Sequence, residues 1–213
     1  MRAILRSLGK ALIVSAAAAS VISMAAAPAL AATTWTVKPG GAVAGTAKPA
    51  TVTDSSKGLS VTCTSSVVKG TLKHGSGLPG AGIGTIASFT FKGCMVAGFT
   101  VTVKVAGKML LNATGPSPAT TVVNMTITKM HGSFSVAALS CSATIDGTKA
   151  TAHNGMVTAT FTNSTDTLTV LTTGGNLHLY NPSSGCTTAV SNGDSVNFTG
   201  GYKLSPAQKI TSP

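Results

Sequence analysis

The sequence contains no glutamate, and aspartate occurs at only four positions, Asp54, Asp146, Asp166 and Asp194. Glycosidases of the common retaining and inverting kinds need two carboxyl groups held a few ångströms apart. Here the aspartates are scattered, and each has a structural interpretation: Asp146 in a turn, Asp54 and Asp194 in loops, Asp166 at the entrance to a strand. We therefore expect no glycosidase site.

Arginine is almost as scarce, because Arg2 and Arg6 are the only two in the chain. Proteins that bind nucleic acids concentrate cations on one face and commonly use arginine for this. The lysines of this chain are instead spread along its length, which suits solvated strand faces and sheet edges. We expect no nucleic-acid partner, but weak, salt-dependent attraction to an anionic cell-wall polymer is possible.

Residues 1–31 have the organisation of a secretory signal peptide. Arg2, Arg6 and Lys10 form a positive segment, residues 11–27 are an apolar run broken only by serines, and Ala29-Leu30-Ala31 matches a cleavage site. Removing these three cations from the 15 lowers the formal charge from +11 to +8. We predict an extracellular domain over residues 32–213, secreted or associated with the cell wall, without a further membrane span.

Apolar and polar residues alternate with a period of two through much of residues 32–213, which is typical of strands with one buried face. Clear examples are residues 59–72, 99–106 and 121–129. No window has the spacing of an amphipathic helix. The pattern predicts an all-β protein, an antiparallel β-sandwich or β-barrel in a single domain, with a possible two-fold internal repeat that divides near residues 115–119.

Glycine-rich breaks between alternating segments predict three hairpins. The central one is the stretch Cys141–Phe161, in which Asp146-Gly147 suits a two-residue type I′ turn. The other two proposed turns lie at residues 172–175, between 168–170 and 176–180, and at Gly200-Gly201, between 196–198 and 202–204. Residues 74–84 are so rich in glycine that a loop is expected.

Cysteine is limited to Cys63, Cys94, Cys141 and Cys186, and none of these lies in a C-x-x-C pair. In an exported protein they are expected to form disulfides. An internal repeat would pair Cys63 with Cys94 and Cys141 with Cys186, since each half has a Leu-Ser strand start followed by a Gly-Cys. Chance in a sequence of low diversity explains the same similarity between the halves. Four cysteines allow three connectivities, and the sequence does not choose among them.

The residues give little support for a catalytic triad, a metal site or a dinucleotide-binding site. No serine occupies a Gly-x-Ser-x-Gly elbow, although His74, His131, His153 and His178 leave a Ser/His/Asp triad possible by inventory. Zinc-like ligand spacing is missing, so no metal site is expected. The glycines at 75, 77 and 80 match a dinucleotide fingerprint, but Pro79 and further glycines prevent the helix that it requires, and no cofactor is expected.

Several segments resemble small secreted proteins of actinomycetes that have no assigned function. The resemblance rests on the segments Trp35–Gly41, Cys63–Ser66, Gly174–Tyr180 and Ile210–Pro213. It implies export and a shared β fold, and it carries no catalytic residue.

Together these observations predict a secreted, disulfide-stabilised protein that is not an enzyme and acts as an envelope-associated or extracellular binding module. The repeated Thr-x-Thr pairs could present a threonine array to ice or polysaccharide, although threonine is also an ordinary strand former. The alternative function is an extracellular carrier that holds a small apolar ligand inside a β-barrel. An interior pocket lined by Val, Met and Phe with few polar groups would favour that carrier.

Overall fold

The computed structural model describes residues 34–116 and 121–212, and this part of the chain is all-β, as predicted. The predicted signal peptide, and residues 117–119 of the proposed midpoint, lie outside the described residues.

The described residues form two sheets, one of twelve strands and one of three. The strands are β1 (Thr34–Lys38), β2 (Gly41–Ala47), β3 (Ala50–Asp54), β4 (Leu59–Leu72), β5 (Gly75–Pro79), β6 (Gly84–Val96), β7 (Phe99–Ala106), β8 (Met109–Pro116), β9 (Val122–Val136), β10 (Cys141–Asp146), β11 (Gly155–Thr162), β12 (Thr167–Val170), β13 (Leu177–Tyr180), β14 (Ser195–Ser205) and β15 (Lys209–Thr211). Two 3-10 helices, η1 (Ala137–Leu139) and η2 (Ser184–Cys186), complete the elements.

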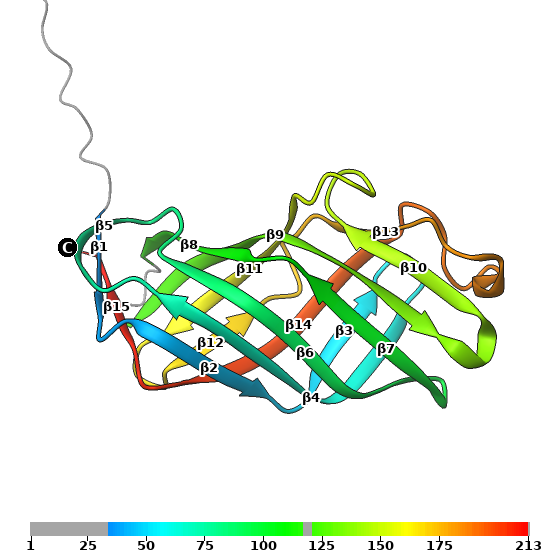
Figure 1. Ribbon diagram of the computed structural model, residues 1–213, viewed down its shortest axis with the longest axis horizontal. Helices are drawn as coiled ribbons and strands as arrows, with labels where there is room; N and C mark the ends of the chain where they lie inside the picture. The colour runs from blue at the N-terminus through cyan, green and yellow to red at the C-terminus, as the bar shows by residue number, and fades with distance from the viewer. Residues whose placement is uncertain (1–33, 117–120, 213) are drawn as a thin grey trace, which may run out of the picture. The chain divides into compact units, whose positions relative to one another are not determined.

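The large sheet closes on itself as a barrel of eight lines of strand. Four lines are the long strands β4, β6, β9 and β14, and each of the others consists of two shorter strands that follow one another: β2 with β3, β7 with β8, β10 with β11, and β12 with β13. Lines adjacent in sequence pair antiparallel around the ring, and β14 closes it by pairing with β2 and β3. Figure 1 shows the long strands running between the two ends of this ring.

The predicted hairpin at Asp146-Gly147 is wrong, because β10 and β11 do not pair with each other. Both pair antiparallel with the same edge of β9, β10 with its C-terminal half and β11 with its N-terminal half. The chain therefore continues in one direction, and residues 147–154 leave the sheet and return to the same line. Strand β9 supplies 15 residues of edge, enough for both short strands.

The other two predicted hairpins are wrong for related reasons. Strands β12 and β13 follow each other along β14, and the Gly200-Gly201 pair lies inside the continuous strand β14. Glycine within a strand commonly marks a bend or bulge in the sheet, which a small barrel needs in order to curve. The glycine-rich segment 74–84 also departs from the prediction, since it contains β5.

One end of the barrel, here called the closed end, is filled by large side chains. Strands β1, β5 and β15 form the small sheet, and they connect directly to β2, β4 and β14 at this end (Figure 1). The largest fully buried side chains, including Trp35, Tyr202, Phe161 and Met125, belong to this half of the fold. Around them Phe89 packs edge-on against Phe198 and Tyr202, with ring centroids 5.8 and 5.5 Å apart.

Tyr202 is the main polar feature of the closed end. Its hydroxyl donates to Ser66 Oγ at 2.9 Å, and both residues are fully buried. Burial raises the pKa of Tyr202, so the phenol stays protonated at physiological pH.

We expect Tyr202→Phe to lower the free energy of unfolding by about 1–3 kcal/mol, because the Ser66 hydroxyl would remain buried without a partner. Urea unfolding measures the change. The double variant with Ser66→Ala should be more stable than Tyr202→Phe alone, since both polar partners are then removed. A double variant that is less stable than the single one would contradict this account.

Candidate functional site

The opposite end of the barrel, here called the open end, encloses an apolar cavity of about 210 Å³. Strands β3, β4, β6, β7, β9, β10, β13 and β14 surround it, which is one complete turn of the ring. Most of its wall is aliphatic or aromatic, formed by Val52, Leu59, Val61, Val96, Val101, Val103, Phe134, Val136, Leu139, Ile145, Leu179, Val190 and Val196. A smaller pocket of about 30 Å³ shares Val52, Val103, Ile145 and Val196 with it.

The cavity exists because the side chains at this level of the ring are small. Val52, Val61 and Val103 line it and are only partly buried, although they belong to strands of a closed sheet. At the closed end the corresponding space is occupied by Phe89, Tyr202 and other large residues. An eight-stranded barrel is just wide enough to be filled by side chains or to hold one small ligand. In this barrel side chains fill the closed end and leave a cavity at the open end.

Exposed apolar side chains gather at the open end. Of the large hydrophobic residues exposed in the described part of the chain, Met95, Phe99 and Leu139 lie on the end of β6, the start of β7 and η1. Leu139 is 44% exposed and also lines the cavity. The entrance to the cavity is therefore apolar as well.

Residues 181–194, here called the cap segment, connect β13 to β14 and supply one wall of the cavity through Gly185, Cys186, Thr187, Ala189 and Val190. The Cys141–Cys186 disulfide ties this segment to the start of β10. Ser183 reinforces the tie, since its Oγ donates to the Ser140 carbonyl at 2.8 Å and accepts from the Ser142 N–H at 2.9 Å.

Gly185 is required where the cap segment meets η1. A Cβ atom added there would lie 2.2 Å from the Leu139 carbonyl oxygen, so any other residue would push the two segments apart. The cap segment is thus held by a disulfide, by hydrogen bonds and by a close backbone approach.

Both disulfides of the structure follow the connectivity that an internal repeat would give. Cys63 and Cys94 are directly opposite on β4 and β6, and Cys141 joins Cys186. No free cysteine remains. The second bond borders the cavity, whereas Cys63 and Cys94 do not line it.

Asp54 is the one charged side chain in the cavity wall. It ends β3 and is 7% exposed. Its Oδ1 accepts from the N–H groups of Ser56 and Lys57 at 2.9 and 3.0 Å, which stabilises the turn that follows. Its Oδ2 is buried and has no hydrogen-bond partner, a state that costs free energy in a folded protein.

Burial raises the pKa of the Asp54 carboxyl above its ordinary value. The N–H groups of Lys57 and Ser56 oppose this shift, and the nearby Asp194 carboxylate adds to it. Because the pKa is higher in the folded state, Asp54 contributes stability at pH values below its unfolded pKa. That contribution is lost as the pH rises through the raised value.

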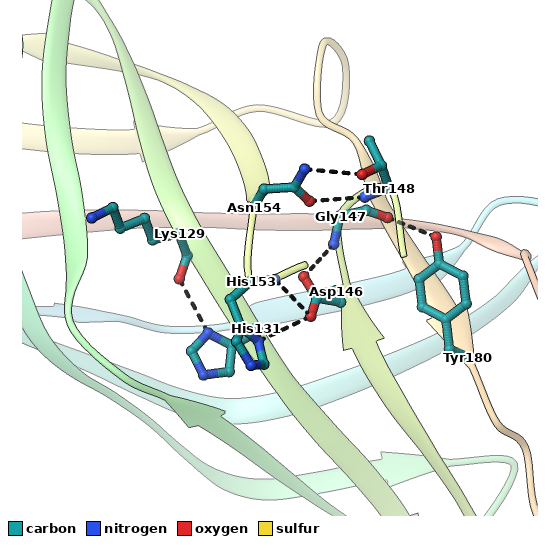
Figure 2. Close-up of polar contacts among 8 residues, drawn as sticks. All are labelled: Lys129, His131, Asp146, Gly147, Thr148, His153, Asn154 and Tyr180. Atoms are coloured by element: carbon teal, nitrogen blue, oxygen red, sulfur yellow. Dashed lines mark hydrogen bonds and ion pairs between the residues drawn. The ribbon is translucent and has the colours of Figure 1, made fainter. Parts of the chain in front are cut away.

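A second polar cluster lies on the loop between β10 and β11, and Figure 2 shows its contacts. The fully buried Asp146 accepts from the Gly147 N–H at 2.7 Å and, through Oδ2, from the N–H and Nδ1 of His153, each at 3.1 Å. Asn154 bonds Thr148 twice, and the Tyr180 hydroxyl donates to the Gly147 carbonyl. Asp146 therefore organises the loop that replaces the predicted type I′ turn.

His131 packs against His153 in this cluster, with ring centroids 4.1 Å apart. The His153 side chain is 58% exposed, whereas His131 is partly buried and lines the smaller pocket. The Nδ1 atoms of the other histidines bond to main-chain carbonyls: His74 to Pro39, His131 to Lys129 and His178 to Gly193. In the described residues no histidine hydrogen-bonds to a serine, and no group of three or more His, Cys, Asp or Glu is placed to hold a metal ion.

From the sequence, a barrel cavity is expected only as an alternative, without its position in the chain, and Asp54 is not placed in the wall of that cavity. Asp54 was placed in a loop, and alternation along a strand does not reveal whether the space inside a barrel is filled. Valines at residues 52, 61, 103 and 196 are the sequence feature that points to the cavity. They are far apart in the sequence and come together only after the sheet closes.

Comparisons with known proteins found no match: no family model, no curated protein and no solved structure matches the chain. Within residues 34–116 and 121–212, none of the helices is long and apolar enough to cross a membrane.

Proposed function

We propose that this protein is an extracellular carrier that binds a small apolar molecule in the cavity at the open end of its barrel. The observation that carries the proposal is the cavity itself, about 210 Å³ with a predominantly aliphatic wall. Small-molecule sites are typically concave and apolar with a few polar groups. Of the two functions considered from the sequence, the carrier is the one that such a cavity supports.

Export is part of the same proposal, and the two disulfides are its support, because such bonds persist in oxidising compartments. All twelve lysines of the described residues are exposed. They would give the exported protein weak, salt-dependent attraction to an anionic cell wall, which would localise a carrier without defining its ligand. No catalytic step is proposed.

Ethylbenzene is a suitable first probe of the cavity, because an apolar cavity of about 150 Å³ is large enough to bind benzene. We expect binding with a dissociation constant of about 1 mM or below. Amide chemical shifts in an NMR titration should change at lining residues such as Val103, Phe134 and Val190, and not at the closed end. Saturating ethylbenzene without any shift at these residues would contradict the proposed function.

A further inference from the structure

We propose that the cavity selects compounds with an unbranched alkyl chain of about eight to ten carbon atoms, and that the chain lies along the barrel axis with its methyl end toward the closed end. This inference rests on the proposed function, and it names the class of ligand. It follows from the position of the smaller pocket behind the larger cavity.

The two pockets lie one behind the other along the barrel. On β7, which begins at the open end, Val101 and Val103 line the cavity, and Val103 and Val105 line the smaller pocket. On β13, which ends at the open end, Leu179 lines the cavity and Leu177 lines the smaller pocket. Inward residues on one strand are about 6.5 Å apart. The smaller pocket is therefore one level of side chains closer to the closed end.

Aromatic side chains form the floor of the smaller pocket. Phe91 and Phe198 line it and pack edge to face, with ring centroids 5.6 Å apart. Below them Phe198 contacts Phe89, which contacts Tyr202 at the closed end. The pocket measures about 30 Å³, which is room for about one or two groups of the size of a water molecule. The end of an unbranched chain fits this space, whereas a ring or a branch point does not.

The polar end of such a compound belongs at the open end. His131 borders the smaller pocket, but the surface that faces the space is apolar. A hydroxyl or carboxyl group placed there would be buried without a partner, which costs free energy. At the open end Thr187 and Leu139 line the cavity and are exposed to solvent. The methyl end therefore goes in first.

The two volumes set the length of the chain. A cavity of about 150 Å³ binds benzene, which has six carbon atoms. By the same ratio the cavity of about 210 Å³ takes about eight carbons, and the smaller pocket adds one or two.

The first test compares 1-octanol with 2-ethyl-1-hexanol, which contain the same atoms and differ only in branching. Calorimetric titration of the protein should show 1-octanol binding at least about tenfold more tightly, because the branched isomer loses the contacts of about two carbons and each contributes about fourfold. A smaller difference, with ethylbenzene still bound, would overturn the inference and leave the carrier function standing. No binding of any of the three probes would overturn both.

Val105→Ile tests the smaller pocket separately, because Val105 lines that pocket and not the cavity. The added carbon should lower 1-decanol affinity by about fourfold or more and leave ethylbenzene affinity within about twofold. Val43→Ile is the matched control, since Val43 is also a partly buried strand valine but lines neither pocket. It should leave both affinities unchanged. Equal 1-decanol affinities in the two variants would overturn the inference.

A crystal structure of the natural protein with 1-octanol provides a measurement that does not depend on the folding of a variant. The terminal methyl group should lie among Val105, Leu177 and Phe198, with the hydroxyl at the open end. A chain coiled within the larger cavity alone, or a hydroxyl group beside Phe198, would overturn the inference and leave the proposed function intact.

Discussion

Loss of either disulfide should lower the free energy of unfolding by about 4 kcal/mol, but only one of them should control ligand binding. The bonds close chain separations of 31 and 45 residues, for which the chain-entropy model gives similar stabilisation. Typical domains have about 5–15 kcal/mol of net stability, so loss of one bond should remove a large share of it and leave a folded protein with a smaller margin.

The difference between the bonds comes from the cap segment. Cys141→Ala with Cys186→Ala frees residues 181–194, which form one wall of the cavity, and affinity for ethylbenzene should fall by about tenfold or more. Cys63→Ala with Cys94→Ala removes a cross-strand bond between β4 and β6, and affinity should stay within about twofold. Urea unfolding gives the stability, and the NMR titration gives the affinity at a temperature where both variants are folded. Equal affinities in the two variants would contradict the assigned role of the cap segment.

Filling the cavity should separate binding from folding. Val103→Phe adds a ring where the structure has space, because Val103 lines both pockets and is only partly buried. We expect ethylbenzene affinity to fall by about thirtyfold or more, and stability to stay the same or rise, since the new ring gains about 25 cal/mol for each Å² removed from water.

Val170→Phe is the control for this prediction. Val170 lies on β12, is 1% exposed and lines no cavity. The same substitution there should overpack the closed end and lower the free energy of unfolding by about 1–3 kcal/mol. Thermal unfolding measures the stability of both variants relative to the natural protein. If Val103→Phe were the more destabilising of the two, the space assigned to the open end would not exist.

The fold class could be predicted from sequence because strand alternation is a local property. β4 and β7 have the predicted bounds, and the all-β class is confirmed. Which strands pair is not local. Asp146-Gly147 and Gly200-Gly201 have turn chemistry, but β9 and β14 are long enough for short strands to lie one after the other along their edges.

The candidate site was less predictable than the fold for the same reason. Val52, Val61, Val103 and Val196 come from four lines of the barrel, and only closure of the ring places them around one space. The turn-forming residues that follow Asp54 in the sequence predict a loop aspartate. Its Oδ1 does stabilise the turn, and only closure of the barrel makes Asp54 part of the cavity wall as well.

The central claim is that the open end of the barrel holds a small apolar molecule. It is tested most directly by a crystal structure of the protein equilibrated with ethylbenzene vapour. The account predicts ligand density enclosed by Val61, Val103, Phe134 and Val190, with the strands unmoved. A cavity closed by inward movement of the cap segment, or ligand density found only on the outer surface of the barrel, would contradict it.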